Sequence, residues 1–152
     1  MAQKTEIRFY HLQQQSLDQA LPAILQKAYQ GNHKIHVRMA DDSEVERMNK
    51  HLWTFKQNVF LPHGSKKDGY AEKQPIWLTS KSENPNQANV IILTQGMTEE
   101  NLEDYDLCCE MLNGHDDNAV KEARERWKKY QDAGLEVTYW HQNDNGGWDK
   151  KA

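Results

Sequence analysis

The sequence predicts an α/β fold of three layers, in which helices cover both faces of a mostly parallel central sheet. Segments with a two-residue apolar period alternate along the chain with segments whose apolar residues recur every three to four positions. Residues 90–93 (VIIL) form a continuous apolar run, which is typical of a strand buried on both faces. The length of 152 residues predicts one domain over residues 1–152.

The first strand–helix–strand unit occupies the N-terminal quarter of the chain. Residues 7–12 (IRFYHL) alternate apolar and polar positions, as a strand does. A helix follows, with Ser16 as its N-cap, Pro22 tolerated in an early turn and Gly31 as its stop. Residues 33–39 read as the next strand, joined by a right-handed parallel crossover. The apolar stripe of the helix comprises Leu17, Leu21, Ile24, Leu25 and Ala28.

A second helix and two more strands are expected in the middle of the chain. Asp41 and Asp42 suit the start of a helix that runs on to Trp53, because carboxylates cap and stabilise a helix N-terminus. Residues 75–80 and the segment around the apolar run, 88–96, read as strands. The expected buried positions of the helix are Val45, Met48 and Leu52, and residues 61–74 are expected to form a loop.

The segment 98–113 is predicted to be a helix. Thr98 would be its N-cap and Glu99 would lie in its first turn. Cys108 and Cys109 would then be a reduced pair on this helix, with one of them buried, as expected in a cytosolic protein.

The clearest helix spans residues 116–134, capped by Asp116 or Asp117 and closed by glycine. Residues 135–142 are the last main strand. The following NDNGG has the composition of a hairpin turn, so residues 143–152 are expected to form either a hairpin arm or a flexible tail.

Composition excludes several classes of function. The net charge of −4 argues against generic nucleic-acid binding, because such domains are usually basic. Two adjacent cysteines cannot complete a four-ligand zinc site, and no metal or cofactor is expected. Because there is no signal peptide and no apolar run of membrane-spanning length, we expect a cytoplasmic protein without membrane contact.

No catalytic motif is apparent. Residues 63–69 (HGSKKDG) resemble a phosphate loop but lack its spacing, and neither G-x-G-x-x-G nor G-x-S-x-G occurs. His33 and His36 would face opposite sides of a strand, and His63 fits packing or capping better than catalysis. The isolated histidines are His11, His51 and His141. Because non-contiguous sites leave no motif, a nucleotide- or phosphate-utilising enzyme remains the alternative to a binding protein.

The helix over 116–134 carries the most informative pattern. Its apolar stripe comprises Val120, Ala123, Trp127 and Tyr130. Lys121, Arg124 and Lys128 lie along the edge of this stripe. One interpretation is a solvated basic edge with Trp127 in the core. The other is a pocket for an acidic peptide whose terminal carboxylate pairs with the cations while an apolar side chain packs on the indole. A phosphate backbone, as in direct single-strand binding, would also fit.

The stretch LWTFKQNVFLPHG, residues 52–64, places large apolar residues where neither period holds. Leu52 can complete the core stripe of the preceding helix. Trp53 and Phe60 then either anchor a partner, as exposed aromatic clusters do, or fold inward over a sheet edge.

Taken in order along the chain, several stretches resemble the chi subunit of bacterial DNA polymerase III holoenzyme. They are RFYHL, ALPAILQKAYQGNHKIHV, LWTFKQNVFLPHG, ARERWKKYQDAG and YWHQNDNGGW. The resemblance implies a Rossmann-like fold that binds no nucleotide and a non-catalytic adaptor. Such an adaptor links the clamp loader, through a psi-type subunit, to the acidic, Phe-terminated tail of single-stranded DNA-binding protein, and so contacts nucleic acid only indirectly.

The resemblance also assigns residues to the two partners. The tail-binding positions of the family fall on Arg124, Trp127 and Lys128. Many relatives have tyrosine at the position of Trp127. A further basic position of the family falls on Val120, where the neighbouring Lys121 can substitute. The psi-binding positions fall on Trp53 and Phe60.

Overall fold

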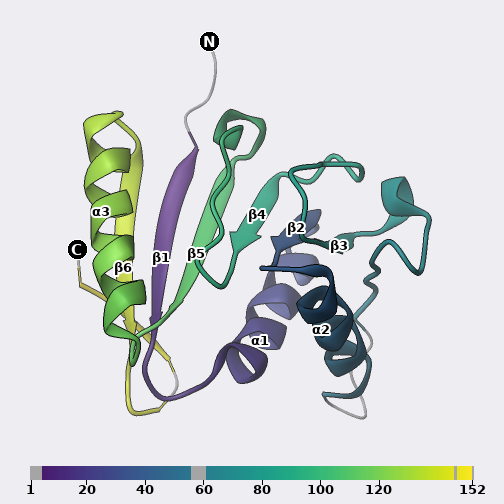
Figure 1. Ribbon diagram of the computed structural model, residues 1–152, viewed down its shortest axis with the longest axis horizontal. Helices are drawn as coiled ribbons and strands as arrows, with labels where there is room; N and C mark the ends of the chain where they lie inside the picture. Colours follow the sequence, from purple (N-terminus) through teal and green to yellow (C-terminus); the bar gives the residue numbers. More distant parts are fainter. Residues whose placement is uncertain (1–4, 56–60, 146, 152) are drawn as a thin grey trace.

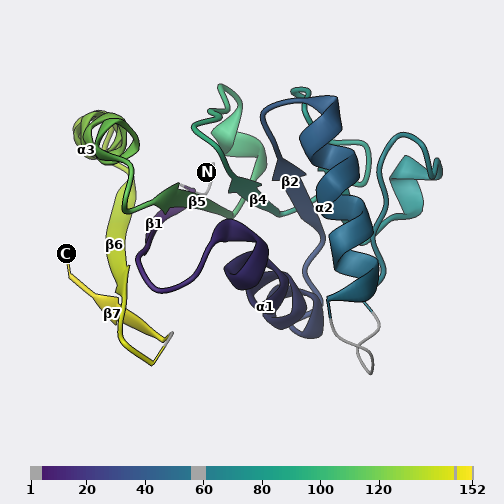
Figure 2. The same cartoon turned by 60° about the horizontal axis from the view of Figure 1, so that its bottom comes forward.

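A computed structural model of the chain describes residues 5–55, 61–145 and 147–151. This part forms the expected three-layer α/β fold: helices α1 and α2 lie on one face of the sheet and helix α3 on the other (Figures 1 and 2). The elements are β1 (Glu6–Leu12), α1 (Leu17–Gln30), β2 (Ile35–Arg38), α2 (Asp42–Thr54), the 3-10 turn η1 (Ala71–Lys73), β3 (Ile76–Thr79), β4 (Val90–Leu93), the 3-10 turn η2 (Leu102–Asp104), β5 (Leu107–Asn113), α3 (Asp117–Asp132), β6 (Glu136–Gln142) and β7 (Trp148–Lys150).

The strands of the described part join in the order β3-β2-β4-β5-β1-β6-β7. Every neighbouring pair is parallel except β6 and β7, which are antiparallel. Trp148 therefore begins the return strand of a hairpin. The sheet is thus the mostly parallel sheet that the sequence predicts.

Two apolar cores lie on the two faces of the sheet, and β1 contributes to both. Ile7 and Phe9 point toward α3, whereas Leu12 points toward α1. This alternation follows from the two-residue period of a strand. The core under α1 and α2 includes Leu21, Leu25, Val37, Met48, Leu78 and Ile92, and the core under α3 includes Ile7, Phe9, Ile91, Cys108 and Ala123.

Helix α1 begins with the predicted cap and contains an internal proline. The side chain of Ser16 accepts a hydrogen bond from the amide of Gln19, whose side chain in turn accepts one from the amide of Ser16. Pro22 has no N–H to donate to the carbonyl of Asp18, one turn earlier. The Nε2 of His51 in α2 donates to that carbonyl at 2.7 Å. This hydrogen bond therefore joins the two helices at the Asp18 carbonyl, which Pro22 leaves without its usual N–H donor.

Helix α2 follows the prediction closely. Asp41 is its N-cap and accepts from the amide of Glu44 at 2.9 Å, which lowers the pKa of the carboxyl group. Val45, Met48 and Leu52 are buried, as expected from their spacing.

The prediction of a helix over residues 98–113 is wrong. The segment forms a loop, the turn η2 and the strand β5, which lies between β4 and β1 in the centre of the sheet. A central strand is apolar on both faces, so its sequence lacks the alternation that identifies an edge strand. Glu110 interrupts the apolar run of β5 but is itself buried. Its carboxylate accepts hydrogen bonds from Arg126 at 2.6 Å and from Tyr130 at 2.7 Å.

The residues of this segment therefore have other roles than the predicted helix implied. Thr98 caps no helix, and Glu99 is buried in an ion pair with Arg38. Cys108 and Cys109 are free thiols on β5, and both are buried, on opposite faces of the sheet. Burial raises the pKa of Cys109 to about 12 and that of Cys108 well above its usual value, so both thiols stay protonated and unreactive.

Candidate functional site: binding faces on helices α3 and α2

The basic helix of the sequence is α3, at one end of the sheet (Figure 1). Asp116 is its N-cap and accepts from the amides of Asn118 and Ala119 at 3.0 and 3.2 Å. Ala123 is fully buried against the sheet. Val120, Trp127 and Tyr130 are partly buried on the same core. The apolar stripe predicted from the spacing is therefore the face that packs on the sheet.

Trp127 lies at the border of this stripe. Its ring centroid lies 5.9 Å from that of Phe9 and 5.7 Å from that of Tyr139, in tilted and edge-on arrangements. One part of the indole packs on these rings, and the residue as a whole keeps intermediate exposure. Packing fixes the orientation of the indole and leaves part of it available as a wall.

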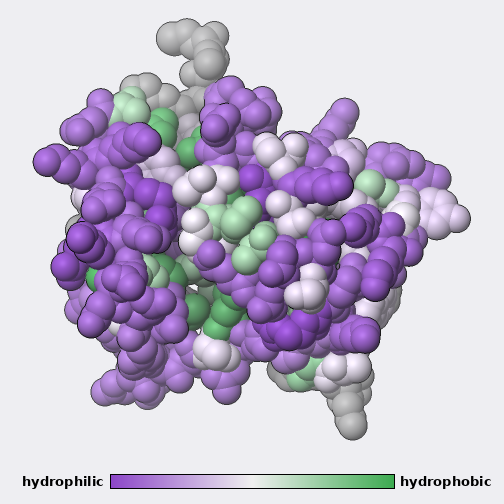
Figure 3. All heavy atoms as spheres, in the orientation of Figure 1, coloured by the Kyte–Doolittle hydropathy of each residue, from purple (hydrophilic) through white to green (hydrophobic). Residues whose placement is uncertain are grey.

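The cations of α3 fall into two groups. Arg126 is largely buried and pairs with Glu110, so its role is structural. Lys121, Arg124 and Lys128 are exposed, and within the described part of the chain none of the three forms an ion pair. In Figure 3 the surface over α3 is almost wholly hydrophilic. These three cations are therefore available to an anionic partner.

Arg124 has neighbours that the sequence did not associate with it. His11 and His141 are partners in the register of the parallel strands β1 and β6, and their ring centroids are 4.2 Å apart. The positive charge of Arg124 contributes to lowering the pKa of both rings, second to burial and to other cations. The prediction that these two histidines are isolated is wrong. His11 follows Phe9 by two residues, as His141 follows Tyr139, but only the pairing of β1 with β6 brings the two rings together.

The geometry defines what this face can bind. Exposed guanidinium and ammonium groups pair with carboxylates, and an indole beside them accepts an apolar side chain. Lys121, Arg124 and Lys128 follow one another along one edge of the helix, with Trp127 next to the last two. The face therefore suits an extended acidic segment with an apolar anchor.

The second face lies at the C-terminal end of α2. Trp53 is 50% exposed, and its ring lies 4.3 Å from that of His63. His63 is buried, with ring nitrogens 2.6 Å from the carbonyl of Leu61 and 3.0 Å from that of Asn49. This confirms packing, as expected for His63, and gives the indole a fixed support. Phe60, the other residue expected here, lies outside the described residues.

A groove runs beside Trp53 along the outer side of α2. Its volume is about 1050 Å³, and its lining includes Lys50, Trp53, Lys66 and Lys67. The Trp53 face and the α3 face do not meet: α2 and α3 lie on opposite faces of the sheet and toward its opposite ends (Figures 1 and 2). The structure therefore keeps Trp53 apart from the residues predicted on α3.

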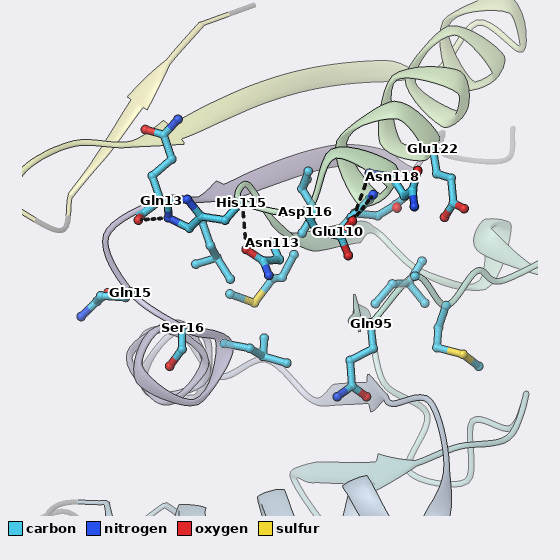
Figure 4. Close-up of a pocket in the computed structure, with 18 of the residues that line it drawn as sticks. Gln13, Gln15, Ser16, Gln95, Glu110, Asn113, His115, Asp116, Asn118 and Glu122 are labelled. Carbon is cyan, nitrogen blue, oxygen red and sulfur yellow. Dashed lines mark hydrogen bonds between the residues drawn. The ribbon is translucent and has the colours of Figure 1, made fainter.

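A cavity of about 810 Å³ lies where β1, β4 and β5 end, between the starts of α1 and α3. Open α/β sheets bind nucleotides in such a crevice. Here the segment after β1 is QQQS, without the glycines that let a backbone approach phosphates. Figure 4 shows amide side chains and the carboxylates of Glu110, Asp116 and Glu122 around the hollow. Its guanidinium groups, Arg47 and Arg126, are paired with carboxylates of the chain. This chemistry does not fit a nucleotide phosphate.

The described residues contain neither a membrane-spanning helix nor a cluster of metal ligands. No helix in this part of the chain is long and apolar enough to cross a membrane. Among the same residues, no group of three or more histidine, cysteine, aspartate and glutamate side chains is arranged to hold a metal ion.

Fold and surface together define an α/β protein of Rossmann-like architecture, with candidate binding faces at opposite ends of the sheet. A sequence model of the family described as "DNA polymerase III chi subunit, HolC" matches residues 4–138, and the chain belongs to this family. A protein of Rickettsia prowazekii (strain Madrid E), described as "Probable DNA polymerase III subunit chi", is 35% identical over 88 residues, which are 58% of this chain. The match spans about half of that relative, 53% of its length.

Proposed function

We propose that this protein is a non-catalytic accessory subunit of the replicative DNA polymerase, acting in the cytoplasm as an adaptor between two proteins. One partner is the acidic C-terminal tail of single-stranded DNA-binding protein, held by Lys121, Arg124, Trp127 and Lys128 on α3. The other is a psi-type subunit of the clamp loader, held at Trp53 and Phe60. The link to nucleic acid is then indirect. Membership of the chi family supports the proposal.

The observation that carries the proposal is the set of exposed cations without ion pairs in the described residues, beside a half-buried Trp127. Each carboxylate of an acidic tail can pair with one of these cations, and the terminal phenylalanine can pack on the indole. The contacts are few and exposed, so we expect a salt-sensitive dissociation constant on the order of micromolar. A weak contact of this kind dissociates readily, which suits a single-stranded DNA-binding protein that must hand over its DNA.

The test is a titration of a fluorescent acidic peptide that ends in Ile-Pro-Phe. Arg124→Ala and Lys128→Ala should each weaken binding roughly tenfold or more, because each removes a charge-assisted contact. Lys129→Ala is the matched control: it removes an exposed cation that lies about 140° around the helix from Arg124, and it should leave the affinity within about twofold. If both test variants bind the peptide as wild type does, the site is wrongly placed.

The same measurements separate the competing functions. Tight binding of a bare oligonucleotide, lost in Arg124→Ala, would indicate direct single-strand binding instead. A thermal shift with ATP, GTP or NAD at sub-millimolar concentration would favour a nucleotide-utilising enzyme. The carboxylates around the crevice at the strand ends lead us to expect no nucleotide shift, and the net charge of −4 argues against tight oligonucleotide binding.

A further inference from the structure

Three rings cluster beside Arg124 at the carboxyl ends of β1 and β6. They belong to His11, Tyr139 and His141 and are called here the histidine cluster. The Nδ1 of His11 lies 2.9 Å from the Tyr139 hydroxyl. The imidazole rings of His11 and His141 are 4.2 Å apart and inclined at 34°. The Tyr139 and His141 rings are 5.3 Å apart. The three rings therefore form one contiguous unit.

His11 is held on its other side by the backbone. A Cβ at position 114 would lie 2.2 Å from the His11 ring, so only glycine leaves room for the imidazole there. His11 is accordingly 7% exposed, whereas His141 has intermediate exposure and forms the outer member of the pair. A ligand on the α3 face meets His141, with His11 fixed behind it.

Two cationic side chains face the cluster. Arg124 approaches from α3 and Lys151 from the segment after β7, while the His115 ring approaches from the turn before α3. The carboxylate on this side is that of Asp149, the cross-strand partner of His141, which accepts a hydrogen bond from Asn143 at 3.4 Å. Tyr139 adds a neutral hydroxyl. The surface beside Arg124 is therefore suited to an anion.

We propose that His141, backed by His11, forms with Arg124 an anion subsite that takes an internal carboxylate of the acidic peptide and gains positive charge as the pH falls. The proposal rests on the tail-binding function and adds its regulation by protons. The occupant is a side-chain carboxylate upstream of the terminal one, because Arg124 precedes Trp127 and Lys128, where we propose that the terminal residue binds, by about one turn of α3.

The sign of the pH effect follows from the surroundings of the rings. Burial, and after it the neighbouring cations, lower the pKa of His11 and of His141, so both rings are neutral in the free protein at pH 7.5. A bound carboxylate raises these pKa values, and the complex then binds more protons than the free protein. By linkage, affinity increases as the pH falls. Two rings in contact share about one proton, because two adjacent imidazolium ions repel.

The experiment compares peptide affinity at pH 7.5, 6.5 and 5.5 at constant ionic strength. Wild type should bind roughly three- to tenfold more tightly at pH 5.5 than at pH 7.5. The range stays above the carboxyl pKa values of the peptide, near 4. In His141→Gln the gain should fall below about twofold. His33→Gln removes an exposed histidine outside this face and should keep the gain of wild type.

A second measurement uses the wild-type protein alone. Calorimetric titration at pH 6.5 in buffers of different ionisation enthalpy should reveal uptake of a fraction of a proton, up to about one, on peptide binding. Absence of uptake, or a gain on acidification that persists in His141→Gln, would overturn the proposal while leaving tail binding intact. Failure of wild type to bind the peptide at any pH would instead overturn the tail-binding function, and this subsite with it.

Discussion

At the scale of single residues, a group of polar side chains is buried beneath the loops that follow β3 and β4. His36 is fully buried, and its Nδ1 lies 2.8 Å from the Tyr105 hydroxyl. Arg38, two residues along β2, pairs with Glu99 and also donates to the carbonyl of Thr98 at 3.0 Å. A buried ion pair needs such additional hydrogen bonds to offset its desolvation. The loop containing Glu99 is therefore tied to the sheet by charge.

We predict that His36 makes the protein sensitive to acid. Burial, followed by the positive charge of Arg38, lowers the pKa of His36 to about 4 from its ordinary value of 6.5. Between these values the unfolded chain binds the proton and the folded chain does not, so stability falls as the pH falls from 6.5 to 4. The loss at pH 4 should be on the order of 3 kcal/mol. Urea unfolding at pH 7, 5 and 4 measures it.

His36→Gln isolates this contribution, because glutamine can still bond to Tyr105 but has no titrating group. The dependence of unfolding free energy on pH should become shallower in this variant, and His33→Gln, an exposed control, should keep the wild-type slope. Equal slopes in wild type and His36→Gln would show that His36 is not the acid-sensitive group.

At the scale of elements, α1 and α2 should be energetically coupled through Pro22 and His51. His51 donates to the Asp18 carbonyl that residue 22 cannot reach with an N–H. We expect His51→Ala to lower the free energy of unfolding by about 1 kcal/mol. The same substitution in a Pro22→Ala background should cost less, because an alanine amide at position 22 supplies the donor.

A double-mutant cycle by urea denaturation at pH 7.5 measures this coupling. The expected interaction energy between the two positions is roughly 0.5–1 kcal/mol. Pro22 is buried, and the cycle cancels the cost of the packing that its replacement by alanine loses. Additive losses would mean that the His51 contact does not compensate for the N–H that Pro22 lacks.

The elements that the sequence predicted correctly are those whose signals are local. Ser16, Asp41 and Asp116 are the N-caps expected, and the stripes of α1, α2 and α3 face the sheet as their spacing requires. The error at residues 98–113 arose because β5 is buried on both faces by elements distant in sequence. Glu110 reads as a surface residue until Arg126 of α3 is placed over it.

The candidate sites divide in the same way. Lys121, Arg124 and Lys128 lie on one helix, so their spacing alone predicted a shared edge. The pairing of His11 with His141 depends on β6 adding to β1 in one register, across 130 residues of chain, and no local pattern indicates it. The sequence therefore predicted the shared edge of the three cations, which lie on one helix. It missed the pair of histidines, which the order of the strands brings together.

At the scale of the whole molecule, the sheet acts as a spacer between the two faces. α3 packs over β5 and β6, and α2 over β3, at the other end of the strand order. Backbone pairing joins every neighbouring pair of strands between them, which supports a rigid spacer. An adaptor with this architecture can hold two partners at once without their competing for surface.

Trp53→Ala tests this independence. We expect it to weaken binding of a psi-type subunit by roughly tenfold or more, since large aromatic residues dominate such interfaces, while peptide affinity at α3 stays within about twofold. Phe60→Ala should behave alike, and Arg124→Ala should show the reverse pattern. Tyr70→Ala is the matched control, because it removes another exposed aromatic residue, 71% exposed, outside the α2 groove. Calorimetry with each partner, alone and with the other present at saturation, measures both affinities. If Trp53→Ala weakens peptide binding as much as psi binding in a protein that is still folded, the two faces are coupled and the rigid-spacer account fails.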